Sequence, residues 1–90
     1  MPARYCLVSG LVQGVAFRWF TKETALRLGL AGWVRNLPDG RVETLLQGPD
    51  ESLTLAMDAL QAGPPHARVA TMACSDRPED PSLRGFVVLR

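Results

Sequence analysis

Ten residues near the start of the chain read Ser9-Gly10-Leu11-Val12-Gln13-Gly14-Val15-Ala16-Phe17-Arg18. They follow an apolar run typical of a strand, Tyr5 to Val8, and precede a segment whose helical periodicity begins around Phe17. Glycine accepts positive φ and lets backbone amides converge. A strand, a glycine-containing loop and a helix start therefore favour an anion site, because successive N–H groups and the helix dipole point to one place. Arg18 adds a charged, planar group suited to phosphate or carboxylate.

The loop differs from several well-known phosphate-binding motifs. The chain has neither a Gly-x-x-x-x-Gly-Lys-Ser/Thr sequence nor a Gly-x-Gly-x-x-Gly sequence. Neither cysteine is followed by an arginine six residues later, as the loop of a cysteine-dependent phosphatase requires. The sequence thus argues against P-loop nucleotidases, dinucleotide-binding proteins and thiol phosphatases.

Two motifs carry a family resemblance. Residues Gly10 to Arg18 match Gly-x-Val-Gln-Gly-Val-x-Phe-Arg, which closely resembles the signature of the acylphosphatases. A second segment looks like their second signature: Gly32-Trp33-Val34-Arg35-Asn36, followed by Gly40-x-Val42 and Gly48-Pro49. The resemblance covers essentially the whole chain. Leu11 departs from the family, where a basic residue is common at this position.

Length and composition indicate one small domain, residues 1–90. The formal charge of +1 shows no basic excess of the kind that nucleic-acid-binding domains carry. No apolar run approaches the roughly 18 residues that cross a membrane, and Met1-Pro2-Ala3-Arg4 leads directly into a strand. We therefore expect a cytoplasmic protein, monomeric, with no nucleic-acid or membrane partner. In that compartment Cys6 and Cys74 are expected as free thiols, with a disulfide as the less favoured alternative.

The remaining pattern predicts five strands and two helices. Helical spacing places Phe17, Phe20, Ala25 and Leu28 on one face of the first helix, which Gly29 ends, and Leu53, Met57 and Leu60 on that of the second. The second helix starts at Gly48-Pro49-Asp50-Glu51, with proline as its first helical residue, and ends at Gly63-Pro64-Pro65-His66. The predicted strands are residues 4–9, 30–36, 41–47, 68–75 and 86–89.

This order, β-α-β-β-α-β with a short C-terminal strand, is that of the α+β, ferredoxin-like split βαβ sandwich, with two helices on one face of an antiparallel sheet. In that topology the first two strands run parallel with the third between them, so their carboxyl ends lie roughly 10 Å apart at one edge of the sheet. The glycine loop follows the first of these ends and Asn36 closes the second. Arg18 and Asn36 are therefore predicted to reach the same small anion.

The resemblance implies a role for each of these groups. Arg18 holds the substrate phosphate together with the backbone amides of Gln13, Gly14, Val15, Ala16, Phe17 and Arg18, and Asn36 positions the attacking water. The implied substrate is a small acyl phosphate, whose carboxylate leaving group needs no general acid. No cofactor or metal is expected, because the carboxylates do not cluster as metal ligands but lie in turns, caps and loops. His66 is interpreted as a surface residue.

Less specific interpretations stay open at this level. Taken singly, the two loop glycines could make only a tight connection, Arg18 could be a solvated arginine, and Asn36 could be a turn residue. The rival function is an anion-binding or interaction module without catalysis, because fold alone does not fix function. A third interpretation is that the chain is a relic of the acylphosphatase-like domain of larger carbamoyl-transfer maturation proteins. A chain that begins and ends at the domain edges argues against this interpretation.

Overall fold

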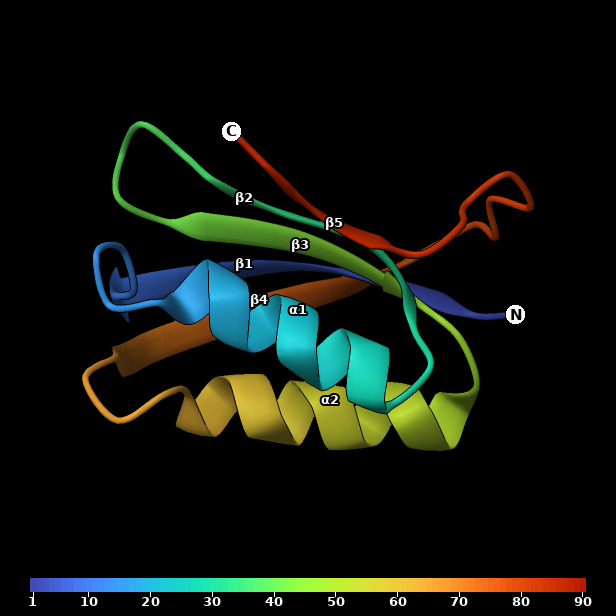
Figure 1. Cartoon of the computed structure of the whole chain (residues 1–90), viewed down its shortest axis with the longest axis horizontal. Helices are drawn as coiled ribbons and strands as arrows, with labels where there is room; N and C mark the ends of the chain where they lie inside the picture. The colour runs from blue at the N-terminus through green and yellow to red at the C-terminus, as the bar shows by residue number, and fades with distance from the viewer.

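The structure, a computed structural model, describes all 90 residues (Figure 1). Seven elements follow one another along the chain: β1 (Ala3–Leu11), α1 (Phe17–Arg27), β2 (Ala31–Asn36), β3 (Val42–Gln47), α2 (Asp50–Ala62), β4 (Arg68–Arg77) and β5 (Phe86–Leu89). The number, type and order of the predicted elements are confirmed. The α1 and α2 helices both lie against one face of the sheet, and the other face is open (Figure 1).

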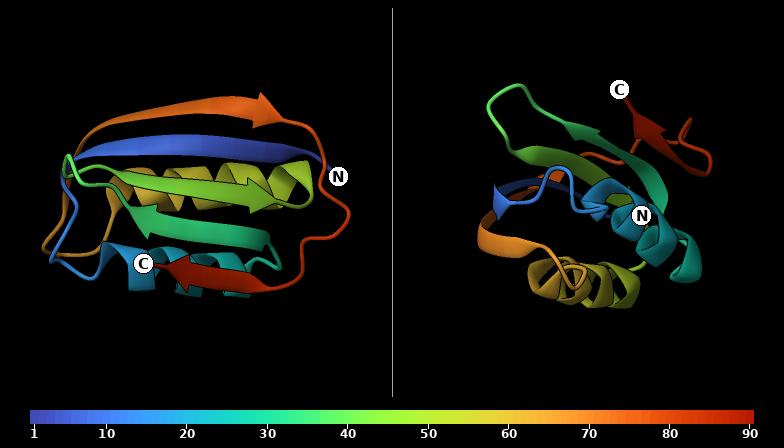
Figure 2. Two further views of the ribbon diagram at one scale, coloured as in Figure 1. Left: turned by 90° about the horizontal axis from the view of Figure 1, so that it is seen from above. Right: turned by 60° about the vertical axis from the view of Figure 1, so that its left-hand side comes forward.

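The five strands form one sheet in the order β4-β1-β3-β2-β5, which Figure 2 (left) shows from β4 in orange to β5 in red. This is the predicted ferredoxin-like arrangement, with β3 between β1 and β2. The sheet is mixed, however, and not antiparallel throughout, because β5 pairs with β2 in parallel. The reason is directional: β4 runs opposite to β1, so the chain reversal after β4 makes β5 run the same way as β2.

Alternating apolar residues along the strands and apolar residues at helical spacing form one hydrophobic core between the sheet and the two helices. Its twelve buried residues are Val8, Val12, Phe17, Ala25, Leu30, Val34, Val42, Leu46, Leu53, Ala56, Leu60 and Phe86. The predicted stripe of α2 is confirmed at Leu53 and Leu60, whereas Met57 is only partly buried and Ala56 takes the intervening core position. Each buried Leu or Phe side chain contributes about 1.5–3 kcal/mol to folding, so this core holds α1 and α2 firmly on the sheet.

Element ends differ from the sequence prediction by one or two residues. Pairing of Ala3 with Arg77 extends both β1 and β4 beyond their predicted limits. Pro49, expected as the first helical residue, is instead the extended residue before α2, which begins at Asp50. Such ends depend on the partner strand and on local backbone angles, neither of which apolar spacing encodes.

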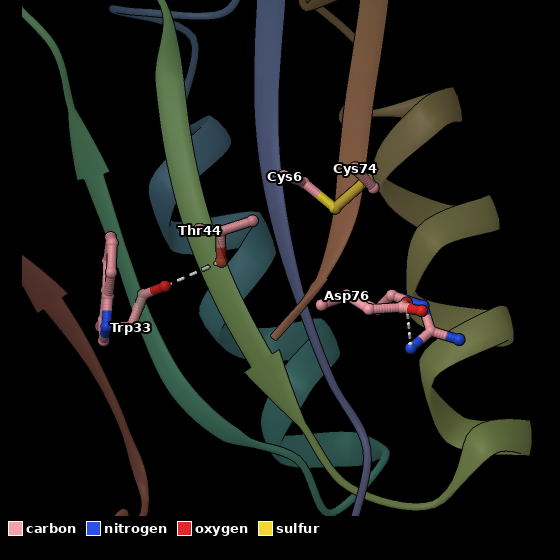
Figure 3. The surroundings of a disulfide bond; sticks show 6 residues. Cys6, Trp33, Thr44, Cys74 and Asp76 are labelled. Atoms are coloured by element: carbon pink, nitrogen blue, oxygen red, sulfur yellow. Dashed lines mark hydrogen bonds and ion pairs between the residues drawn. A yellow bond between two sulfur atoms is a disulfide. The ribbon is translucent and has the colours of Figure 1, made fainter. Parts of the chain in front are cut away.

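Cys6 and Cys74 form a disulfide, so the expectation of free thiols is wrong for this structure (Figure 3). The two residues are direct partners in the register of β1 and β4, with Cα atoms 4.1 Å apart. The expectation rested on the cytoplasmic compartment, where thiols are normally kept reduced, and not on the geometry of the two strands. Which β4 residue faces Cys6 is fixed by long-range pairing, which residue spacing alone does not reveal.

Candidate active site

The site begins where β1 leaves the regular sheet. The register of β1 with β4 shifts between Ser9 and Gly10, as in a β-bulge. Gly10 has φ 125°, and a Cβ added there would lie 2.2 Å from the carbonyl oxygen of Arg68. Only glycine fits this close approach of two backbones. The bulge therefore fixes how the chain departs from β1 into the loop.

The loop has an unusual backbone conformation at the residue before α1. Ala16, the residue before the helix, adopts left-handed angles (φ 63°, ψ 24°), and no side chain caps the helix. A non-glycine residue in this region is strained by about 1–3 kcal/mol, and such strain gathers at functional sites. None of the backbone N–H groups from Gln13 to Trp19 donates to an acceptor in the chain. A run of free donors at a helix start is suited to bind an anion.

Gln13 joins this loop to the turn between β2 and β3. Its side-chain amide donates hydrogen bonds to the carbonyl oxygens of Leu37, at 2.8 Å, and Arg41, at 2.9 Å. Leu37 directly follows Asn36. The sequence assigned only the backbone of Gln13 to the site, and this positioning contact of its side chain was missed because it depends on tertiary structure.

Arg18 and Asn36 line one cavity of about 360 Å³ at the predicted edge of the sheet. Its walls come from the loop, α1, β2 and β5: Val12, Gly14, Ala16, Phe17, Arg18, Trp19, Lys22, Asn36 and Val88. The side-chain oxygen Oδ1 of Asn36 is buried and has no hydrogen-bond partner. A buried acceptor without a hydrogen-bond partner costs about 1–3 kcal/mol of folding free energy.

The C-terminal strand β5 helps to hold Arg18. Arg18 Nη1 donates to the carbonyl oxygen of Leu89 at 3.2 Å, and Figure 2 (left) shows the C-terminus near the start of α1. The sequence prediction did not include β5 in the site. No signal in the sequence could have found it, because the parallel pairing of β2 with β5 joins segments that are far apart in the chain.

The cavity wall carries positive charge without a carboxylate. Arg18 and Lys22 are its charged residues, no Asp or Glu lines it, and neither cation takes part in any of the chain's ion pairs. His66 is exposed in the turn after α2 and is not on the wall, as predicted. Nowhere in the chain do three His, Cys, Asp or Glu side chains gather in a group that could hold a metal ion.

The acidic groups with shifted pKa values lie outside the cavity. The pKa of Asp39 is lowered by hydrogen bonds from the backbone and side chain of Arg41, and that of Asp80 by hydrogen bonds from Ser82. Burial raises the pKa of Glu43, but hydrogen bonds from Tyr5 and Arg35 outweigh it, so the net shift is downward. These carboxylates stay ionised at neutral pH and serve structural contacts.

The fold and the cavity together define a ferredoxin-like α+β domain with a positively charged cavity at one end of its sheet. The sequence profile of the acylphosphatase family matches residues 4–88. The acylphosphatase of Nitrosococcus oceani is 51% identical over 83 residues, 92% of each chain, and that of Thermus thermophilus is 47% identical over 98% of this chain and 99% of its own. The crystal structure of acylphosphatase from Bacillus subtilis aligns over 100% of both chains with a TM-score of 0.96 at 34% identity.

The chain therefore belongs to the acylphosphatase family. Its enzyme class is that of these relatives: it is a hydrolase, an acylphosphatase. Neither α1 nor α2 has the length and apolar character that a membrane-spanning helix needs.

Proposed function

We propose that this enzyme cleaves the carboxyl–phosphate bond of small acyl phosphates by direct attack of water on phosphorus, without a metal or cofactor. The observation that carries the proposal is the shared cavity: Arg18, Asn36 and the start of a run of unpaired amides meet in one place. The substrate is a small molecule, and the acting unit is the single domain of residues 1–90, working as a monomer in the cytoplasm.

The phosphate lies in the loop, where the amides of Gln13, Gly14, Val15, Ala16, Phe17 and Arg18 donate to its oxygens. The guanidinium of Arg18 faces the same oxygens with two parallel donors. In phosphoryl transfer the negative charge is spread over three equatorial oxygens, so fixed donors around them stabilise the transition state. Because the loop amides have no backbone partners in the free protein, they need not break other hydrogen bonds before they act.

Asn36 orients the attacking water. Asn36 lines the cavity, so its side-chain amide is placed to hydrogen-bond that water and to fix its approach to phosphorus. The water oxygen forms a bond to phosphorus while the bond from phosphorus to the acyl oxygen breaks, and that electron pair leaves with the carboxylate. The water proton passes to a phosphate oxygen, because no carboxylate or histidine lines the cavity as a base.

A site with so few catalytic groups is sufficient because the leaving group is a carboxylate. A carboxylic acid has a pKa of about 4 to 5, so the carboxylate departs without being protonated. A phosphomonoester would instead expel an alkoxide or phenoxide, and the cavity has no carboxylic acid or histidine to protonate it. The enzyme should therefore discriminate between the two classes of phosphate by the leaving group.

The test measures hydrolysis of benzoyl phosphate and of phenyl phosphate in excess chelator, with Arg18→Ala as the comparison. We expect chelator-resistant turnover of benzoyl phosphate alone, reduced about 100- to 1,000-fold in Arg18→Ala, the range for losing one such donor. A folded protein that binds phosphate but turns over neither compound would contradict the proposal and favour a binding module. Turnover that the chelator abolishes would contradict the metal-free mechanism.

A further inference from the structure

The cavity extends past the phosphate-binding groups along α1. Beyond Arg18 its wall is made by Trp19 and Lys22 of α1 and by Val88 of β5. None of these three side chains has a part in holding the phosphate or the attacking water. They form a second end of the same cavity, into which the acyl group of a bound substrate would extend.

This second end has exposed apolar walls. Trp19 is 60% exposed and Val88 is 37% exposed, so both side chains offer apolar surface to a ligand. An exposed aromatic beside a polar anchor is typical of ligand pockets, where apolar walls accept the body of the ligand and a few polar groups orient it. An acyl chain or aromatic acyl ring fits between these walls.

Lys22 adds a charge that nothing in the chain neutralises. It lies four residues after Arg18, hence on the same face of α1 and about 6 Å further along the helix axis. Its Nζ lies 5.8 Å from the ring centroid of Trp19, and no carboxylate pairs with it. Two cations one helical turn apart on a wall without acids favour a ligand with two separated negative charges.

We propose that Trp19, Lys22 and Val88 form an acyl-group subsite in which Lys22 binds a second anion on the acyl chain. The preferred substrates are acyl phosphates whose acyl group carries a carboxylate or another negative charge several bonds beyond the carbonyl. Lys22 is thus a specificity-determining residue. The inference rests on the proposed function, because it takes the phosphate to lie at Arg18.

The experiment compares 4-carboxybenzoyl phosphate with 4-methylbenzoyl phosphate, which have similar shape and differ in the distal charge. The quantity measured is the ratio of their kcat/KM values at fixed ionic strength. In Lys22→Met this ratio should fall about three- to fivefold, the range for a partly exposed ion pair, mainly through a higher KM for the charged substrate. Lys22→Arg should retain the ratio. Arg27→Met, which removes a charge from α1 outside the cavity, is the matched control and should leave it unchanged.

Binding separates a failure of this inference from a failure of the proposed reaction. The aroylmethylphosphonates with the same two aryl groups replace the scissile oxygen by a methylene and cannot be hydrolysed. Tighter binding of the carboxylated phosphonate, lost in Lys22→Met, supports the subsite even for an inactive protein. Equal ratios in the wild type and Lys22→Met, in turnover or in binding, or an equal fall in Arg27→Met, would overturn it.

Discussion

Arg18 at the start of α1 and Asn36 at the end of β2 line the same cavity, although they belong to different layers of the fold. The sheet order explains how: β1 and β2 run in the same direction with β3 between them, so the loop after β1 and the end of β2 lie at one edge. The guanidinium is tied to Leu89, whereas the Asn36 oxygen has no partner.

Replacement of Asn36 by Ala should lower kcat for benzoyl phosphate about 100-fold and change KM little. The reason is that the orientation of water matters in the transition state, while the substrate phosphate is held by other groups. Steady-state kinetics beside the binding of inorganic phosphate measure the two effects. An unchanged kcat in a folded Asn36→Ala protein would remove the role assigned to this residue.

The side chain of Gln13 should stabilise both the loop and the turn after Asn36. Gln13→Ala removes two partly buried hydrogen bonds and should lower the free energy of unfolding by about 1–2 kcal/mol, and kcat should fall with it. Gln13→Glu is the sharper comparison, because a carboxylate has the same size but no proton to donate to the carbonyls of Leu37 and Arg41. We expect Gln13→Glu to be at least as unstable as Gln13→Ala in urea unfolding. A Glu variant as stable as the wild type would contradict the assigned hydrogen bonds.

Protonation of Glu43 at low pH should lower the stability of the folded protein. Its side chain is 8% exposed and accepts hydrogen bonds from Tyr5 and Arg35, which hold its pKa below the ordinary value of 4.5. The unfolded chain therefore takes up this proton first as the pH falls. The contribution of the ionised carboxylate is fully present above pH 4.5 and is lost as the pH drops through the folded pKa.

We expect Glu43→Gln to be less stable than the wild type by about 1 kcal/mol at pH 7, a modest value because Arg35 is 43% exposed. The difference in the free energy of unfolding between the wild type and Glu43→Gln should become smaller when the pH is lowered to 3. Urea midpoints at the two pH values measure it. A gap that stays constant with pH would mean that the charge of Glu43 adds nothing to stability.

Reduction of the Cys6–Cys74 bond should destabilise the protein without altering its catalysis. A cross-link over 68 residues restricts the unfolded chain by about 4 kcal/mol in the chain-entropy model. A reductant should therefore lower Tm, whereas the double variant Cys6→Ala, Cys74→Ala should show no response to it. Neither cysteine lines the cavity, so kcat of the reduced, folded protein should match that of the oxidised one. If the reductant leaves the Tm of the wild type unchanged, Cys6 and Cys74 are free thiols and the disulfide is contradicted.

Local signals in the sequence predicted most of the fold and the central pair of the site. Apolar spacing from Phe17 and the stop at Gly29 indicated α1, and the order of elements placed Asn36 and the glycine loop at one edge. The features that the sequence did not predict are contacts between residues far apart in the chain. The parallel pairing of β5, the contact of Arg18 with Leu89 and the bond between Cys6 and Cys74 join segments 54 to 71 residues apart, and their register is set by packing of the whole sheet. Helical spacing alone places Lys22 on the same face of α1 as Arg18, but only the structure shows that Arg18, Trp19 and Lys22 line one cavity.

The most direct test of the mechanism is the fate of the oxygen when benzoyl phosphate is hydrolysed in water enriched in ¹⁸O. Water held by Asn36 and aimed at phosphorus should place one labelled oxygen in inorganic phosphate and none in benzoate, as mass spectrometry of the two products would record. Label in benzoate would mean that water attacks the carbonyl carbon. That result would contradict the roles assigned to Arg18, Asn36 and the loop amides.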